Sequence, residues 1–252
     1  MPQRVDQDWV VRTLSNGMER PPQKSSPDLL AWPGYELPWP RQSGFINRKQ
    51  ELDHLWKELH PQPGARSVCL ISGMVGSGKT ALALEFAYRY MSRYSRCTWL
   101  MAESDELIPH PRRSPQLIIV DSASDPDKWL ELVPQHEASI LITTRASHWN
   151  SLQLAGLDPS EATHWVLSAL DELARPSMRE CVAGLCERFS WLPFPLHVLR
   201  RIFLRGFRTP DEIAQRIEQL SPSKWLRQEI LQDPSLSYRP LDQVLDELQV
   251  LG

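Results

Sequence analysis

The stretch VCLISGMVGSGKTALALEFAYRYM, residues 68–91, decides the fold. It opens with an apolar run typical of a buried strand and ends in an alanine- and leucine-rich segment typical of a helix. Between them, Gly73, Gly78, Lys79 and Thr80 satisfy the pattern G-x-x-x-x-G-K-[ST]. A strand before this pattern and a helix after it are the context that a phosphate-binding loop requires. The stretch therefore predicts a phosphate-binding loop.

The residue types in this loop suit the binding of phosphate and Mg²⁺. Glycines let the backbone wrap around anionic oxygens, so that N–H groups and the helix N-terminus bind them. We expect Lys79 to neutralise the β- and γ-phosphates and the Thr80 hydroxyl to ligate Mg²⁺. The nucleotide-binding residues predicted in the loop are Gly73, Gly76, Ser77, Gly78, Lys79, Thr80 and Ala81.

Apolar segments that predict further strands follow the loop. They are CTWLMA (97–102), LIIVD (117–121), SILITT (139–144) and THWVLS (163–168). Uninterrupted apolar runs favour a parallel sheet covered on both faces. Residues 103–116, which contain three prolines, are predicted to form a loop. The fold class is thus α/β, a P-loop NTPase parallel sheet with flanking helices, followed by a small all-α domain.

The candidate catalytic residues are Asp121, which ends a predicted strand, and Arg145, which comes directly after one. Asp121 is expected to reach Mg²⁺ across the phosphate loop, and Arg145 to sense the γ-phosphate at the carboxyl edge of the sheet. Many P-loop ATPases carry a second acid after the first to orient the attacking water. Here Ser122 holds that position and cannot act as a base at neutral pH, while Asp125 is predicted to cap the next helix. Hydrolysis is therefore expected to be slow or absent.

The flanking segments predict helices. Leu52, Leu55, Trp56 and Leu59 fall on one helical stripe, and no strand is predicted after residue 170, where Thr209 opens a capping box. Four regions are predicted in all. They are a proline-rich N-terminal extension (1–40), a P-loop NTPase domain (41–170), a helical domain (171–222) and a helical C-terminal segment with an apolar stripe at 241–248 (223–252).

The order of motifs resembles the NB-ARC branch of the STAND P-loop NTPases, the switch module of plant resistance proteins and apoptosome-type proteins. The matching segments are FINRKQEL (45–52), GMVGSGKT (73–80), TWLMA (98–102), LIIVD (117–121), ILITTR (140–145) and WLPFPLHVL (191–199). They are similar to the family's hhGRxxEL, phosphate loop, second strand, Mg²⁺ strand, sensor strand and GLPLAL helix start. Asn47 and Trp191 depart from the family by replacing its glycines.

The resemblance implies a switch that binds ATP or ADP with Mg²⁺ and controls protein–protein interaction or self-assembly. Phe45, Ile46 and Arg48 would lie on the adenine side, and Pro193 would close the pocket from the helical domain. The chain would lack most of the family's winged-helix domain and any effector or repeat domain. It would be a minimal switch core, a fragment of one, or one half of a system whose output sits on another chain. Two alternatives stay open, a small P-loop kinase with its acceptor pocket in residues 103–116 and a DNA-associated ATPase.

Composition and charge indicate which kinds of binding partner and which cell compartment to expect. The 252 residues carry a net charge of -3, so no dominant basic face for nucleic acid is expected. Arg200, Arg201, Arg205 and Arg208 lie in a basic amphipathic stretch, which we interpret as a solvated helix face. The four cysteines include no CxxC pair and are expected to be reduced core residues. With no apolar leader or long apolar run, the sequence predicts a cytoplasmic protein without a membrane span.

Overall fold

The computed structural model describes residues 35–42, 44–46, 48–60, 64–102, 115–133, 138–147, 150–206, 208–233 and 235. These residues fall into two compact units. The α/β unit holds the described residues of Gln23–Met74 and Gly78–Leu154, and the helical unit holds those of Val75–Ser77 and Ala155–Gly252. Predictions made for residues 1–34, 103–114 and 241–248, and for Asn47, lie outside the described residues.

A parallel sheet forms the centre of the α/β unit, as the predicted α/β class requires. Its strands are β1 (Tyr35–Glu36), β2 (Ser67–Ser72), β3 (Arg96–Met101), β4 (Gln116–Ala123), β5 (Ala138–Thr144) and β6 (Ser151–Gln153). Their order across the sheet is β1-β3-β4-β5-β2-β6, and every pairing is parallel. The strands predicted at 97–102, 117–121 and 139–144 are confirmed, whereas β1 and β6 were not predicted.

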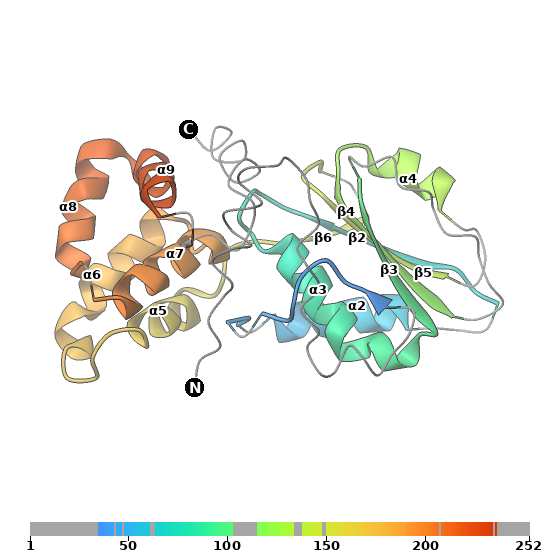
Figure 1. Ribbon diagram of the computed structural model, residues 1–252, viewed down its shortest axis with the longest axis horizontal. Coiled ribbons are helices and arrows are strands. Elements are labelled where there is room, and N and C mark those ends of the chain that lie inside the picture. Colours follow the sequence, from blue (N-terminus) through green and yellow to red (C-terminus); the bar gives the residue numbers. More distant parts are fainter. Residues whose placement is uncertain are drawn as a thin grey trace. The chain divides into compact units, whose positions relative to one another are not determined.

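Helices cover both faces of the sheet, as the uninterrupted apolar strands predict. On one face lie α2 (Lys49–Leu59) and α3 (Lys79–Tyr90), and on the other lies α4 (Pro126–Leu132) (Figure 1). A short 3₁₀ helix, Met91–Arg93, follows α3. Neighbouring residues of one strand point to opposite faces, so Ile119 packs with α2 and α3 while Ile118 packs with α4. Asp125 caps α4 by accepting from the Lys128 N–H at 3.1 Å, which confirms its predicted role.

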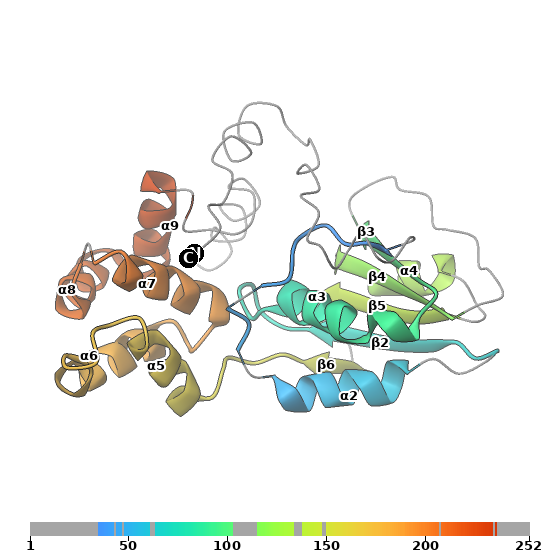
Figure 2. The same cartoon turned by 60° about the horizontal axis from the view of Figure 1, so that its bottom comes forward.

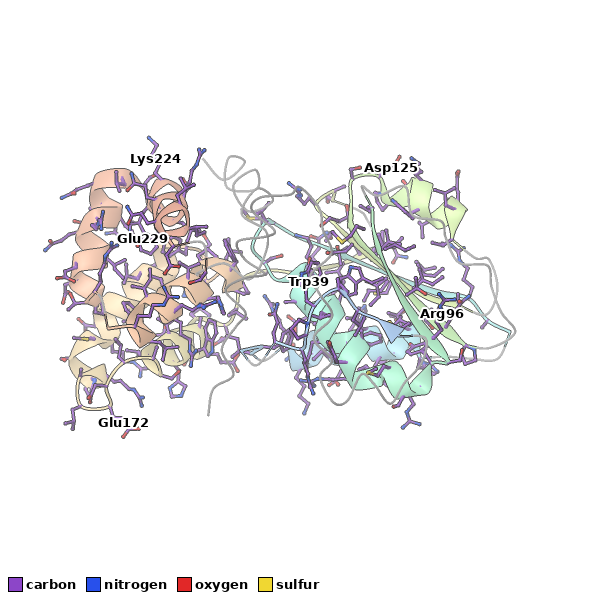
Figure 3. The ribbon with its side chains drawn as sticks, in the orientation of Figure 1. Trp39, Arg96, Asp125, Glu172, Lys224 and Glu229 are labelled. Atoms are coloured by element: carbon purple, nitrogen blue, oxygen red, sulfur yellow. The ribbon has the colours of Figure 1, made fainter. Side chains whose placement is uncertain are left out.

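The segment before α2 is tied to α3 by hydrogen bonds to Glu85. Arg41 donates to both carboxylate oxygens at 2.7 and 3.0 Å, and Arg89 donates to one at 2.6 Å. Burial acts to raise the pKa of Glu85, but these bonds outweigh it and lower that pKa below its usual value. Trp39, labelled in Figure 3, accepts a bond from the Tyr88 hydroxyl at its carbonyl and packs edge-on against Trp99.

Among the described residues of the helical unit, five helices pack as one group (Figure 2). They are α5 (Pro159–Leu167), α6 (Arg175–Arg188), α7 (Pro193–Leu204), α8 (Pro210–Leu220) and α9 (Pro222–Gln232). The capping box predicted at Thr209 is present at the start of α8. The strand predicted at 163–168 is wrong, because Asp158 caps a helix there with Pro159 at its first position. Its buried residues Ala162 and Val166 are four apart, which is helical spacing.

Three of the four cysteines are core residues as the sequence predicts, whereas Cys181 is half-buried. All four are free, and Cys69, Cys97 and Cys186 are buried, with burial raising the pKa of each thiol to about 12. Such thiols stay protonated at neutral pH and act as apolar packing groups. Within the part of the chain that the structure describes, no helix has the length and apolar character needed to cross a bilayer.

The helical unit offers a matched pair of glycines for a test of stability. A Cβ at Gly156 would lie 2.3 Å from the Ser190 carbonyl oxygen, whereas a Cβ at Gly184, inside α6, meets nothing within 4 Å. We expect Gly156→Ala to lower the free energy of unfolding by about 1–3 kcal/mol, as overpacking does. Gly184→Ala should raise it by about 0.5–1 kcal/mol through helix propensity. Urea unfolding followed by circular dichroism measures both, and equal stabilities would contradict the packing described.

Candidate functional site: a phosphate loop facing an acidic strand end

The loop between β2 and α3 turns tightly because its glycines adopt left-handed backbone angles. Gly76 has φ of 78° and Gly78 has φ of 91°, a region that side chains with a Cβ rarely occupy. Gly78 is the N-cap of α3, so the first free N–H groups of a 12-residue helix belong to the loop itself. The loop thus combines backbone donors with the positive end of a helix, the arrangement that favours a bound phosphate.

Lys79 lies against the loop that it follows. Its ammonium group donates to the carbonyl oxygens of Gly73 and Met74, each at 2.8 Å. These bonds hold a positive charge beside the backbone amides of residues 76–80. A lysine held there can meet the oxygens of a phosphate chain with little reorganisation, since the charge is already in place.

Thr80 and Asp121 meet between the start of α3 and the end of β4. The Thr80 hydroxyl donates to the two carboxylate oxygens of Asp121 at 2.9 and 3.2 Å. Asp121 has no exposed surface. Because the hydroxyl proton goes to Asp121, the oxygen lone pairs of Thr80 remain available to a cation. The structure therefore brings together the two residues that the sequence singles out for Mg²⁺.

The donor set at this position suits Mg²⁺. Magnesium keeps several waters and takes one or two protein oxygens together with phosphate oxygens, rather than a protein cage. One hydroxyl and one carboxylate, both hard oxygen donors, match that preference. Among the described residues no cluster of three or more His, Cys, Asp or Glu side chains could hold a metal, so no competing site of that kind is present there.

Thr143 is a site residue that the sequence reading missed. It is buried near the end of β5, with its hydroxyl donating to Asp121 Oδ1 at 2.6 Å and accepting from the Ser122 N–H at 2.8 Å. The available signal was a pair of threonines, Thr143 and Thr144, at the end of the apolar run of β5. Finding it required the strand order, which places β5 beside β4.

The structure also places the residues predicted to sense the γ-phosphate and to bind adenine, which are Arg145, Phe45, Ile46 and Arg48. Arg145 follows the last residue of β5 and is exposed, and Phe45 packs on the core under α2 and α3. Arg48 is buried at the N-cap of α2 and pairs with Glu51 at 2.8 Å. Ile46 is half-buried next to Phe45 in sequence. No contact in the structure yet tests an adenine-binding role for these residues.

Pro193 is the first residue of α7, and the next residue, Phe194, contacts the tip of the loop between β2 and α3. The tip, Val75–Ser77, groups with the helical unit, where the Phe194 N–H donates to the Gly76 carbonyl at 3.2 Å. A Cβ at Gly76 would lie 3.5 Å from the Phe194 Cβ, so these backbones approach closely.

The arginines of the basic stretch bind groups of their own unit. Arg205 pairs with Asp233 and donates to Ser235 at 2.6 Å, and Arg208 pairs with Glu229, whose position Figure 3 marks. Arg200 lies over the Trp165 ring, 5.4 Å from its centre. The stretch is therefore not the solvated face that the sequence predicts, because much of its charge is matched inside the helical unit.

Comparisons with known proteins find similarity only at the level of structure. No protein-family model matches the sequence, and no curated protein matches it. Among solved structures, Cdc6p from Pyrobaculum aerophilum is 12% identical, with 71% of this chain and 65% of that chain covered and a TM-score of 0.43. The Walker-type ATPase PABY2304 of Pyrococcus abyssi is 11% identical over 83% of this chain and 90% of its own, also with a TM-score of 0.43. At these values neither similarity tells what this chain binds.

Proposed function

We propose that this chain binds an adenine nucleotide, ATP or ADP, together with Mg²⁺ in the loop Gly73–Thr80. One observation carries the proposal: Thr80, at the start of the helix that follows the glycine-rich loop, bonds to a fully buried acid at the end of β4. The loop and helix supply donors for phosphate, Lys79 supplies charge, and Thr80 with Asp121 would hold the cation. When bound, Mg²⁺ neutralises phosphate charge.

We further propose that the nucleotide acts as a switch rather than as the substrate of a fast enzyme. Ser122, which follows Asp121, has no carboxylate to act as a base on the attacking water. The carboxylate of Asp125 is engaged as a helix cap. The loop tip at Gly76 contacts Phe194, next to Pro193, so phosphates entering the loop would act on the start of α7. A ligand that favours one arrangement of this contact over another shifts the population between them. The shifted population would expose or hide a surface for a protein partner or a second copy.

Two other functions compete with the switch. A small P-loop kinase would need an acceptor pocket, for which residues 103–116 are the candidate, and most of these lie outside the described residues. A DNA-associated ATPase would need free basic charge, but Arg205 and Arg208 are paired with carboxylates. Consumption of ATP with a phosphate acceptor would favour the kinase, and salt-dependent DNA binding would favour the DNA-associated ATPase.

Nucleotide affinity should depend on the charge of Lys79. Charge-assisted hydrogen bonds are worth about 1.5–3 kcal/mol, so Lys79→Ala should weaken ADP and ATP binding about tenfold or more. Isothermal titration calorimetry gives the affinities, with circular dichroism to verify the fold. Lys57→Ala, which removes an exposed lysine from α2, is the matched control and should bind like the wild type. Unchanged affinity in a folded Lys79→Ala protein would refute the assignment of the loop.

Hydrolysis of ATP by the wild type should proceed at single-turnover rates or slower, because no base follows Asp121. Ser122→Asp should restore part of the activity. Ser122 has φ of 64°, and Asp occupies this region more readily than most residues, so the substitution suits the backbone. Phosphate release measures the rate, with nucleotide affinity determined in parallel. Multiple turnover in the wild type, undiminished by Asp125→Ala, would show that another group orients the water.

The switch itself predicts that apo, ADP and ATP-analogue forms differ in two segments. These are residues 45–48 and 191–199, which the resemblance places around the nucleotide. A difference of about 1.4 kcal/mol in ligand affinity between two arrangements changes their ratio about tenfold, which hydrogen exchange detects. If nucleotide is bound and both segments exchange identically in all three forms, the switch proposal should be abandoned in favour of a nucleotide-stabilised scaffold.

A further inference from the structure

β4 contains a bulge at the residue that follows Asp121. Val120 pairs with Ile142, and the next aligned pair is Ala123 with Thr144, so Asp121 and Ser122 together face the single residue Thr143. Ser122 takes up the extra length with a left-handed backbone, φ 64°. Bulges of this kind redirect side chains and often adjoin functional sites.

The Thr143 hydroxyl forms hydrogen bonds with two groups at the bulge, the Ser122 N–H and the Asp121 carboxylate. It accepts from the Ser122 N–H at 2.8 Å and donates to Asp121 Oδ1 at 2.6 Å. A hydroxyl has one proton, and an N–H can only donate. The direction of both bonds is therefore set: the Thr143 proton goes to the carboxylate, and the backbone fixes where the hydroxyl sits. Thr143 is 1% exposed, so water does not compete for these bonds.

Asp121 Oδ1 consequently lies between two hydroxyl donors, Thr143 at 2.6 Å and Thr80 at 2.9 Å. The two threonine hydroxyl groups differ in how firmly their own positions are fixed. Thr143 is anchored on a central strand by the Ser122 amide, whereas Thr80 is the half-buried residue expected to turn its lone pairs to a cation. Removal of the Thr143 hydroxyl would take away the shorter of these two bonds to Oδ1 and loosen the hold on the carboxylate.

We propose that Thr143 is a positioning residue that fixes the Asp121 carboxylate against Thr80 and thereby sets how strongly Mg²⁺ enhances nucleotide binding. It acts through Asp121 and is not assigned a contact with the nucleotide. The inference rests on the proposed nucleotide site and adds to it a residue that governs the metal-dependent part of affinity.

The matched variants are Thr143→Val, Thr143→Ser and Thr98→Val. The first keeps the shape of the side chain and removes the hydroxyl, and the second keeps the hydroxyl. Thr98 lies on β3 of the same sheet and is buried, and its hydroxyl has no hydrogen-bond partner among the residues that the structure describes. Thr98→Val therefore controls for a buried threonine-to-valine change. Thr143→Ala provides a second variant without the hydroxyl in case valine prevents folding.

The experiment measures the dissociation constant of ADP by calorimetry in Mg²⁺ and in EDTA for each protein. For the wild type, Thr143→Ser and Thr98→Val, Mg²⁺ should tighten binding by similar factors. For Thr143→Val the Mg²⁺ enhancement should fall about tenfold, the scale of one hydrogen bond to a charged group, while affinity in EDTA stays close to that of the wild type. A purely structural defect would weaken binding equally in both conditions.

A second measurement needs neither metal nor nucleotide. The Ser122 amide should exchange with solvent faster in Thr143→Val than in the wild type, Thr143→Ser or Thr98→Val, because only the first lacks the acceptor oxygen. NMR-detected hydrogen exchange of the apo protein reports this amide directly. Unchanged Ser122 exchange in Thr143→Val would overturn the contact on which the inference depends.

The outcomes separate the two proposals. A wild type that binds no nucleotide overturns the proposed function and this inference with it. A wild type that binds ADP equally well in Mg²⁺ and EDTA overturns the inference and the Mg²⁺ part of the proposed function, while leaving nucleotide binding itself in place. A Thr143→Val protein that keeps the full Mg²⁺ enhancement overturns the inference alone. Equal weakening of Thr143→Val in Mg²⁺ and EDTA also overturns it, by showing a general structural role.

Discussion

A carboxylate without exposed surface, Asp121 at the end of an apolar strand, is the constraint around which the α/β unit is arranged. An ionised group taken out of water is costly unless hydrogen bonds or opposite charge compensate it. Two hydroxyl groups provide that compensation, Thr80 from the start of α3 and Thr143 from β5. Both donors are uncharged hydroxyl groups, so these two bonds stabilise the carboxylate without bringing an opposite charge to it.

The strand order explains why these groups meet. β5 lies between β2 and β4, so Thr143 is level with Asp121, while the loop after β2 returns the chain to α3 and places Thr80 on the other side of the carboxylate. All strands are parallel, and their carboxyl ends lie at one edge of the sheet. The helices α2, α3 and α4 bury both faces of that sheet and fix the edge in place.

Much of this could be predicted from the sequence where the signal was local. The glycine-rich turn between β2 and α3, the three central strands, the cap at Asp125 and the capping box at Thr209 each depend on residues close together in the chain. The strand expected at 163–168 is wrong because a short apolar run fits a buried helix as well as a strand, and the helix start at Asp158 and Pro159 lies before that run. Thr143 could not be found because its role depends on a bulge, and the partners of Arg205 and Arg208 lie about twenty or more residues away in a different helix or beyond it.

The central claim is that a nucleotide with Mg²⁺ binds at the edge formed by Gly73–Thr80, Asp121 and Thr143. The most direct measurement is to titrate Mg²⁺ and ADP into nucleotide-free protein and follow the backbone amides by NMR. The account predicts that the largest shifts fall in residues 73–81, at the end of β4 and at the end of β5, and that they saturate at one nucleotide per chain. Shifts centred elsewhere, or none at millimolar nucleotide, would contradict it.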